Sequence, residues 1–159
     1  MSAKTKATPA PAPASAEEAL PGATYRDAFA LILGERIGVP EAAQRTLGAT
    51  PGWVKGLMNL RNALVAPFGL KDGPQPEQQR RIGFFPILSE DEHRMVLGLD
   101  DKHLDFRIVL DVEPDGESAT RVIATTLVKT HNAFGRAYLA MVMPFHRLIV
   151  PVMLNQATN

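Results

Sequence analysis

The sequence predicts an α+β domain in which most strands follow one another as antiparallel hairpins and a long helix closes the chain. Two patterns carry this prediction. Residues 104–113 alternate almost throughout between apolar and charged side chains, which is the period of a strand with one dry and one wet face. Residues 132–154 repeat apolar side chains at spacings of three and four, which is the period of a helix. Hairpins followed by a helix are typical of the α+β class.

The length of 159 residues suits one domain behind an unstructured tail. Residues 1–20 are mostly Ala, Pro, Ser, Thr and Lys. Because such a segment has little apolar surface to offset the entropy of ordering, we expect a disordered Ala/Pro-rich tail. Residues 21–155 are then expected to form a single domain.

The first half of the domain is predicted to contain one strand and two short helices. The strand runs from Thr24 to Ile32 with imperfect alternation. A short helix opens at Pro40 and covers Glu41–Leu47, and a second, amphipathic helix covers residues 51–65. A polar loop over residues 71–80, rich in Gly and Pro, separates these helices from the strands that follow.

The second half is predicted to be a run of antiparallel strands. Residues 82–88 form a strand that Pro86 interrupts, which indicates an edge strand or a bulge. Residues 94–99 and 103–113 form the two arms of a hairpin. Residues 119–130 form a β-branched strand whose inward face is undecided, because both alternating sets of side chains are largely apolar.

The last element is predicted to be a kinked helix from Asn132, a good N-cap residue, to about Leu154. Pro144 lies inside it, so we expect a kink around Met141 to Pro144. The longest uncharged stretch in its first half, residues 137–145, is far shorter than the roughly 20 apolar residues that cross a bilayer. We therefore expect a core helix and no membrane span.

Composition excludes several classes of function. The chain has no cysteine, which excludes disulfides, thiol nucleophiles and Cys-ligated zinc or iron-sulfur clusters. Lys plus Arg and Asp plus Glu are 17 each, so there is no general basic excess for binding nucleic acid. Glycine-rich nucleotide-binding motifs and nucleophile motifs do not occur. Because these motifs are absent, we also expect no cofactor. The N-terminus lacks the apolar block of a signal peptide, so we expect a cytoplasmic protein.

Four segments resemble a bacterial family of unknown function: Trp53–Val65, Ile82–Glu90, Thr130–Leu139 and the Pro-Phe-His-Arg-Leu-Ile run at Pro144–Ile149. The order of elements is also similar to the helix-grip fold of START-like and polyketide-cyclase-like (SRPBCC) proteins. That resemblance implies a curved antiparallel sheet wrapped around a long C-terminal helix, with room for an apolar ligand between them. Members of the family are single domains or follow an NAD(P)-binding Rossmann domain, and the resemblance implies no catalytic residue.

Candidate ligand contacts are Tyr138, His146, Arg107 and His131. In an otherwise apolar helix, His146 either binds a ligand carboxylate or phosphate or anchors the helix to another element. His131 ends a strand where the last helix begins, so it either lines the mouth of a cavity or belongs to a capping junction. The acidic runs near His93 and His103 lack the spacing of a metal loop, so we expect no metal site.

Three functions fit this sequence. The first is binding of a small apolar or amphipathic ligand between the sheet and the C-terminal helix. The second is an interaction module that docks on a separate Rossmann-type oxidoreductase, as the fused arrangement of similar proteins implies. The third is an enzyme of the cyclase or dehydratase type, which requires a His or carboxylate with a perturbed pKa in a closed pocket.

Overall fold

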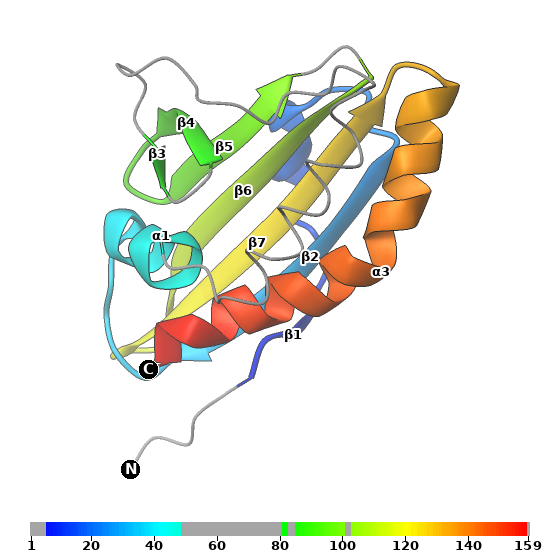
Figure 1. The fold of residues 1–159 in the computed structure, drawn as a ribbon. Helices are drawn as coiled ribbons and strands as arrows, with labels where there is room; N and C mark the ends of the chain where they lie inside the picture. Colours follow the sequence, from blue (N-terminus) through cyan, green and yellow to red (C-terminus); the bar gives the residue numbers. More distant parts are fainter. Residues whose placement is uncertain (1–5, 49–80, 83–84, 101–102, 159) are drawn as a thin grey trace.

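The computed structural model describes residues 6–48, 81–82, 85–100 and 103–158. They form a twisted, fully antiparallel sheet with two helices on one face (Figure 1). The strand order is β1-β2-β7-β6-β5-β4-β3. The strands are β1 (Thr8–Pro9), β2 (Tyr25–Leu33), β3 (Arg81–Ile82), β4 (Phe85–Glu90), β5 (Arg94–Asp100), β6 (Leu104–Asp115) and β7 (Ala119–Thr130). The helices are α1 (Val39–Leu47), α3 (Ala133–Asn155) and two 3-10 turns, Ala14–Ala19 and Gln156–Thr158.

The predicted α+β class is therefore confirmed, and so are the strand from residue 24 and the helix after Pro40. Both arms of the predicted hairpin are present as β5 and β6. The strand predicted over residues 82–88 is divided between β3 and β4, and a bulge follows Pro86 at Leu88, where the pairing of β4 with β5 shifts register between Ile87 and Ser89. The helix predicted over residues 51–65 and the loop over residues 71–80 lie outside the described residues.

The face of the sheet that carries α1 and α3 is called the inner face here, and it holds the main core. Phe29, Leu31 and Leu33 of β2 point inward with the even-numbered residues of β6 and β7, because Leu31 pairs with Val122 and Leu110 pairs with Ala124. Val39, Ala42, Ala43 and Leu47 of α1 and Met153 and Leu154 of α3 complete this apolar cluster.

The outer face is also largely apolar, and residues 10–20 cover part of it. Ala16 and Leu20 pack against Val96, Val109 and Leu127. Nearby, Ala10 and Ala12 pack against Ala28, Ala30 and Ile123. This covering layer explains why the inward face of β7 could not be read from its sequence, since both of its faces are buried.

We call residues 6–20 the N-terminal strap, and its packing differs from the disorder predicted for residues 1–20. The Ala7 amide donates to Asn155 Oδ1 at 2.8 Å, and the Ala10 amide donates to the Ala28 carbonyl at 2.9 Å. Arg94 donates to both the carbonyl and the hydroxyl of Ser15. The strap has no large side chains, but alanine is small enough to lie close against the sheet, where it excludes water from other apolar residues.

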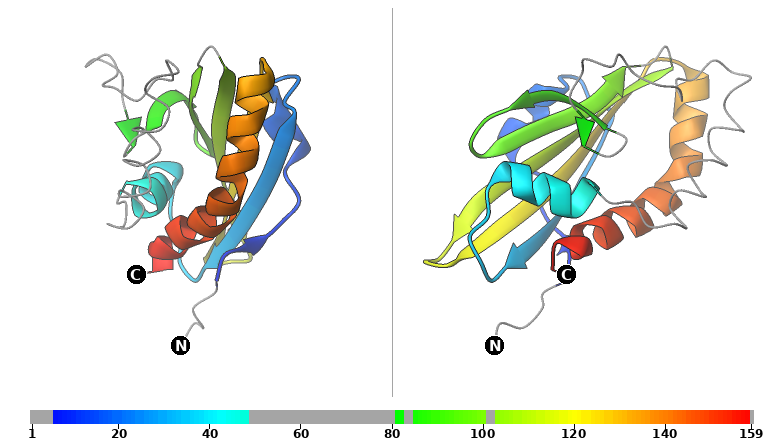
Figure 2. Two further views of the ribbon diagram at one scale, coloured as in Figure 1. Left: turned by 45° about the vertical axis from the view of Figure 1, so that its right-hand side comes forward. Right: turned by 60° about the vertical axis from the view of Figure 1, so that its left-hand side comes forward.

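Helix α3 begins at Asn132, as predicted, and the Asn132 side chain accepts a hydrogen bond from the Gly135 amide at 2.9 Å. The helix then bends near its middle, where Pro144 lies (Figures 1 and 2). The bend lets the C-terminal half of α3 run across the inner face toward α1. Its last turns bury Met153 and Leu154 in the core.

Candidate functional site

The four ligand contacts predicted from the sequence do not lie together. Tyr138 and His146 are both half-buried residues of α3, about two turns apart. Arg107 lies on the outer face, where its Nη1 donates to Asp100 Oδ1 at 2.7 Å. His131 also meets the outer face, with Nε2 3.1 Å from Asp105 Oδ1. Arg107 and His131 therefore cannot line a site between the sheet and α3.

The structure instead gathers a different set around His146, which we call the Asp27 cluster: Tyr25, Asp27, His146 and Arg147. The Tyr25 hydroxyl donates to Asp27 Oδ2 at 2.5 Å, and His146 Nε2 lies 3.3 Å from Asp27. The rings of Tyr25 and His146 meet edge to face with centroids 6.4 Å apart. Arg147 completes the cluster, because it lies close enough to Tyr25 and Asp27 to lower the pKa of both groups.

Strand β2 and helix α3 each place two members of this cluster. Tyr25 and Asp27 are alternate residues of β2, so both point to the inner face with Phe29. His146 and Arg147 follow Pro144 on α3, at the point where the bent helix crosses β2. The Asp27 and His146 side chains are mostly buried, with 20% and 16% of their surfaces exposed. The cluster is thus a polar contact between the sheet and the helix within an apolar layer.

Asp27 stays ionised in this setting. Burial acts to raise its pKa, but the hydrogen bonds from His146 and Tyr25 outweigh that effect and hold the pKa below its usual value of 3.8. The Tyr25 hydroxyl behaves in the opposite way. Burial and its hydrogen bond to the Asp27 carboxylate raise the pKa of Tyr25 above 10.0, although Arg147 opposes the shift. The ground state of the cluster is therefore a carboxylate and a neutral phenol.

These shifts predict a pH dependence of stability with two separate limbs. The lowered pKa of Asp27 adds stability that is complete above pH 3.8 and is lost as the pH falls through the folded-state pKa. The raised pKa of Tyr25 adds stability that is complete below pH 10.0 and is lost as the pH rises through the folded-state pKa. In the wild type the urea concentration at the unfolding midpoint should fall at acidic and at alkaline pH. The fall at acidic pH (the acid limb) should be lost in Asp27→Asn, and the fall at alkaline pH (the alkaline limb) should be lost in Tyr25→Phe. The outer-face variant Asp105→Asn should keep the Asp27 limb, and an unchanged acid limb in Asp27→Asn would contradict the assignment.

Residues 19–153 match the model of a protein family described as a protein of unknown function (DUF2867). The chain belongs to this family. No curated protein and no solved structure gives a significant match. The matched span contains the whole Asp27 cluster, whereas most of the N-terminal strap precedes it. The cluster is therefore part of the DUF2867 domain itself.

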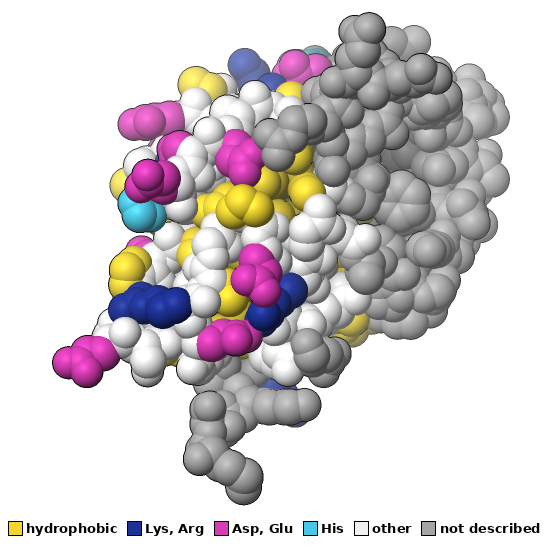
Figure 3. Space-filling view, turned by 90° about the vertical axis from the view of Figure 1, so that its left-hand side faces the viewer, with side chains coloured by type: hydrophobic (Ala, Val, Ile, Leu, Met, Phe, Trp, Pro, Cys, Tyr) yellow, Lys and Arg dark blue, Asp and Glu magenta, His cyan; other side chains and the backbone are white. Residues whose placement is uncertain are grey.

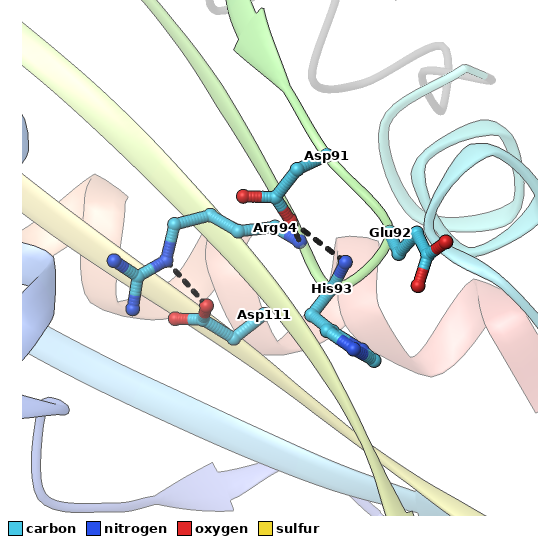
Figure 4. A pocket seen from close by; sticks show the side chains of 5 residues that line it. All are labelled: Asp91, Glu92, His93, Arg94 and Asp111. Atoms are coloured by element: carbon cyan, nitrogen blue, oxygen red, sulfur yellow. Dashed lines mark hydrogen bonds and ion pairs between the residues drawn. The ribbon is translucent and has the colours of Figure 1, made fainter.

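A second polar group lies at the turn between β4 and β5 of this DUF2867 domain (Figure 4). The side chains of Asp91, Glu92, His93, Arg94 and Asp111 surround a shallow, open hollow of about 400 Å³. Asp91 Oδ1 accepts hydrogen bonds from the His93 and Arg94 amides, and these bonds lower the pKa of Asp91. Arg94 Nε donates to Asp111 Oδ1 at 2.6 Å.

The contacts in this hollow are those of a turn and a cross-strand ion pair. Figure 4 shows the Glu92 and His93 side chains pointing away from the Arg94–Asp111 pair. Among the described residues of the DUF2867 domain, no three His, Asp or Glu side chains lie close enough to hold a metal ion. Among the coloured, described residues in Figure 3, charged side chains of both signs are interspersed with apolar ones.

The junction between β7 and α3 uses a different histidine from the one that the sequence suggested. Asn132, while capping α3, also lies 3.0 Å from His103 Nδ1, and the His103 ring packs against Phe134 with centroids 4.5 Å apart. The His131 amide donates to the His103 carbonyl at 2.9 Å, whereas the His131 imidazole pairs with Asp105. The junction is therefore a cap built by the β5–β6 turn and the start of α3.

Tyr25 and Asp27 were not among the candidate contacts predicted from the sequence, although a signal was present. The inward positions of β2 are Tyr25, Asp27, Phe29, Leu31 and Leu33, so one carboxylate interrupts an apolar set. A carboxylate at such a position needs a partner, and a partner on α3 is far away in the sequence. His146 could be singled out alone, whereas its pairing with Asp27 required the fold.

Proposed function

We propose that this DUF2867 domain binds a small amphipathic ligand between its sheet and α3, with the Asp27 cluster as the polar end of the site. The observation that carries the proposal is the cluster itself. Among the inward positions of β2, β6 and β7, Asp27 is the one carboxylate, and it meets His146 and Arg147 where the surroundings are otherwise apolar. Apolar walls with a few convergent polar groups are typical of small-molecule sites.

The cluster retains hydrogen-bonding capacity beyond its internal contacts. His146 uses Nε2 for Asp27, and its Nδ1 has no hydrogen-bond partner within the part of the chain that the structure describes. Arg147 lies near the Tyr25 hydroxyl, yet it remains exposed and its guanidinium has five donors in total. With Nε2 donating to the Asp27 carboxylate, His146 Nδ1 donates a hydrogen bond only when the imidazole is protonated, whereas Arg147 always donates. A ligand carboxylate would accept hydrogen bonds from Arg147 and from the protonated imidazole. The neighbouring apolar residues of the inner face, Ile108 and Val128, would contact its hydrocarbon part.

The arrangement of the elements supports the same proposal. An antiparallel sheet that packs a long C-terminal helix on one face is compatible with the helix-grip arrangement. We propose that the domain is a bacterial, START-like member of that architecture (SRPBCC). The Asp27 cluster would then lie at the boundary between the helix and the sheet, where a ligand would enter.

The test is titration of the full-length chain with dodecanoate, a carboxylate with an apolar chain, by isothermal calorimetry. Binding is expected for the wild type and about tenfold weaker binding for His146→Gln and Arg147→Gln, because each loses a charge-assisted hydrogen bond. His131→Gln is the matched control, since His131 pairs with a carboxylate on the other side of the sheet. Equal affinities in His146→Gln and His131→Gln would overturn the assignment of the site. Native mass spectrometry of freshly purified protein, with solvent extraction of any adduct, would identify the natural ligand.

A second candidate is an acid-base enzyme of the cyclase or dehydratase type, which the contact between Asp27 and His146 favours. A carboxylate that fixes one ring nitrogen of a histidine leaves the other nitrogen placed to take up and return a proton. Here Asp27 would orient the imidazole, and Nδ1 would exchange a proton with the ligand. Deuterium uptake from heavy water into an extracted ligand would support this candidate, provided that His146→Gln abolishes it.

A further inference from the structure

The hydrogen bond between His146 and Asp27 can run in only one direction. Asp27 is ionised, because its pKa is held below the usual value of 3.8, and a carboxylate accepts hydrogen bonds but cannot donate them. His146 Nε2, which lies 3.3 Å from this carboxylate, must therefore carry the ring proton. In a neutral imidazole the other nitrogen, Nδ1, is then an acceptor. A ligand carboxylate is also only an acceptor, so a neutral His146 cannot bind it.

In the part of the chain that the structure describes, the other ionisable groups that face His146 are Tyr25, Asp27 and Arg147. The Tyr25 hydroxyl donates to Asp27 Oδ2 at 2.5 Å, and its raised pKa keeps it a neutral phenol. Arg147 lies close enough to lower the pKa of Asp27. The cross-strand partners of Tyr25 and Asp27 on β7 are uncharged: Val128 and Thr126. The residues three and four positions from His146 on α3 are apolar: Val142, Met143, Ile149 and Val150.

The remaining elements packed on α3 meet it near its C-terminal end (Figure 1). The N-terminal strap contacts Asn155 through the Ala7 amide, about two and a half turns beyond His146. The ionisable residues of α1, Glu41 and Arg45, pair with each other at 2.6 Å. The 3-10 turn Gln156–Thr158 contains no ionisable side chain. The charge of the proposed ligand site therefore depends on Asp27, Arg147 and His146.

Charge balance favours the uptake of a proton when an acid binds. Without a ligand, the Arg147 cation balances the Asp27 carboxylate. A ligand carboxylate adds a second negative charge where the Asp27 and His146 side chains are mostly buried, and an uncompensated charge there is costly. Protonation of His146 removes the excess, and the imidazolium donates from Nε2 to Asp27 and from Nδ1 to the ligand. A single proton thus satisfies both the charge and the hydrogen bonds.

We propose that the site takes up one proton from solution with each carboxylate that it binds, so that its ligands are amphipathic monocarboxylic acids that are released as the pH rises. This inference rests on the proposed ligand site. The buffer supplies the proton, and the count is the same whether His146 Nδ1 or the ligand oxygen holds it. Because the ligand favours the protonated imidazole, affinity is complete where the free imidazole is already protonated. Above that range it falls about tenfold for each pH unit.

The test is isothermal calorimetry of the full-length chain with dodecanoate in phosphate and in Tris buffer, at about pH 8, where an ordinary histidine is neutral. The two buffers differ in their enthalpy of ionisation, so the difference between the observed binding enthalpies counts the protons taken up. We expect about one proton in the wild type and about none in His146→Gln. His131→Gln is the matched control, because His131 pairs with Asp105 at 3.1 Å on the other side of the sheet. Its proton count should equal that of the wild type.

A neutral ligand provides a second control that requires no substitution. The hydroxyl of 1-decanol can donate to the neutral Nδ1 of His146, so its binding to the wild type should take up no proton. Dodecanoate binding without proton uptake, or an equal proton count in His146→Gln, would contradict this proposal and leave the proposed ligand site standing. Absence of dodecanoate binding would contradict both. The two failures are therefore distinguishable in one set of titrations.

Discussion

Replacing Gly135 by alanine is expected to lower the free energy of unfolding by about 3 kcal/mol, which corresponds to a fall in melting temperature of roughly 10 °C for a domain of this size. Gly135 lies in the first turn of α3, where the helix approaches the turn between β5 and β6. A Cβ added there would lie 2.1 Å from the His103 carbonyl oxygen and 3.0 Å from its carbon. Both are main-chain atoms, so relief requires the helix start or the turn to move.

This result would reverse the usual effect of the substitution. On helix propensity alone, alanine in place of glycine inside a helix stabilises by up to about 1 kcal/mol. Gly38→Ala is the matched control, because an added Cβ there lies 3.7 Å from Pro40 Cδ, an ordinary contact, and Gly38 precedes α1 in an extended conformation. Its expected cost is below about 1 kcal/mol. Urea denaturation of both variants decides the matter, and a stabilised Gly135→Ala protein would contradict the close contact between α3 and the turn.

Introducing a charge under the N-terminal strap is expected to cost about 2 kcal/mol of stability. Ala16 is fully buried against Val109 and Leu127 on the outer face of the sheet. In Ala16→Asp the carboxylate must either stay unpaired among apolar side chains or force the strap off the sheet. Detachment limits the cost, because it exposes the apolar residues that the strap covers and gives up the hydrogen bonds from Arg94 to Ser15.

Ala14→Asp provides the control for this prediction. Ala14 lies in the same 3-10 turn as Ala16 but is exposed, so the substitution should change stability by less than about 0.5 kcal/mol. Removal of residues 1–18 should destabilise the domain as much as Ala16→Asp does, and it should increase the hydrogen exchange of amides in β6 and β7. If Ala16→Asp and Ala14→Asp unfold at the same urea concentration, the strap does not pack on the sheet.

Local patterns were sufficient for most of the fold. The charged residues at 105, 107, 111 and 113 lie on one side of β6, so the sequence predicts which side of that strand faces the core. Asn132, followed by apolar residues at helical spacing, predicts where α3 begins. The strand over β7 was equally clear, but its inward face was not. The strap buries the outer side of that strand as well, so alternation carries no information there.

The residues of the candidate site were likewise predicted only in part from the sequence. His146 was evident from the sequence as a polar residue in an apolar helix, His131 was chosen because it ends a strand where the last helix begins, and Arg107 was chosen by residue type alone. The strand register then places Arg107 on the outer face, and His131 pairs with Asp105 on that side. Asp27 and Tyr25 enter the site because β2 lies under the bend of α3, a relation between residues more than a hundred positions apart.

The sequence by itself determined the class of the fold, the order of its strands along the chain, the cap and proline of the last helix, and the exclusion of thiol chemistry. These properties depend on periodicity, on the backbone preferences of single residues and on composition, all of which are local. Only the tertiary structure decided which face of each strand is covered, that an alanine-rich segment packs on the sheet, and that Asp27 meets His146. Those properties depend on contacts between distant segments, whose free energy comes from burial and pairing in the assembled domain.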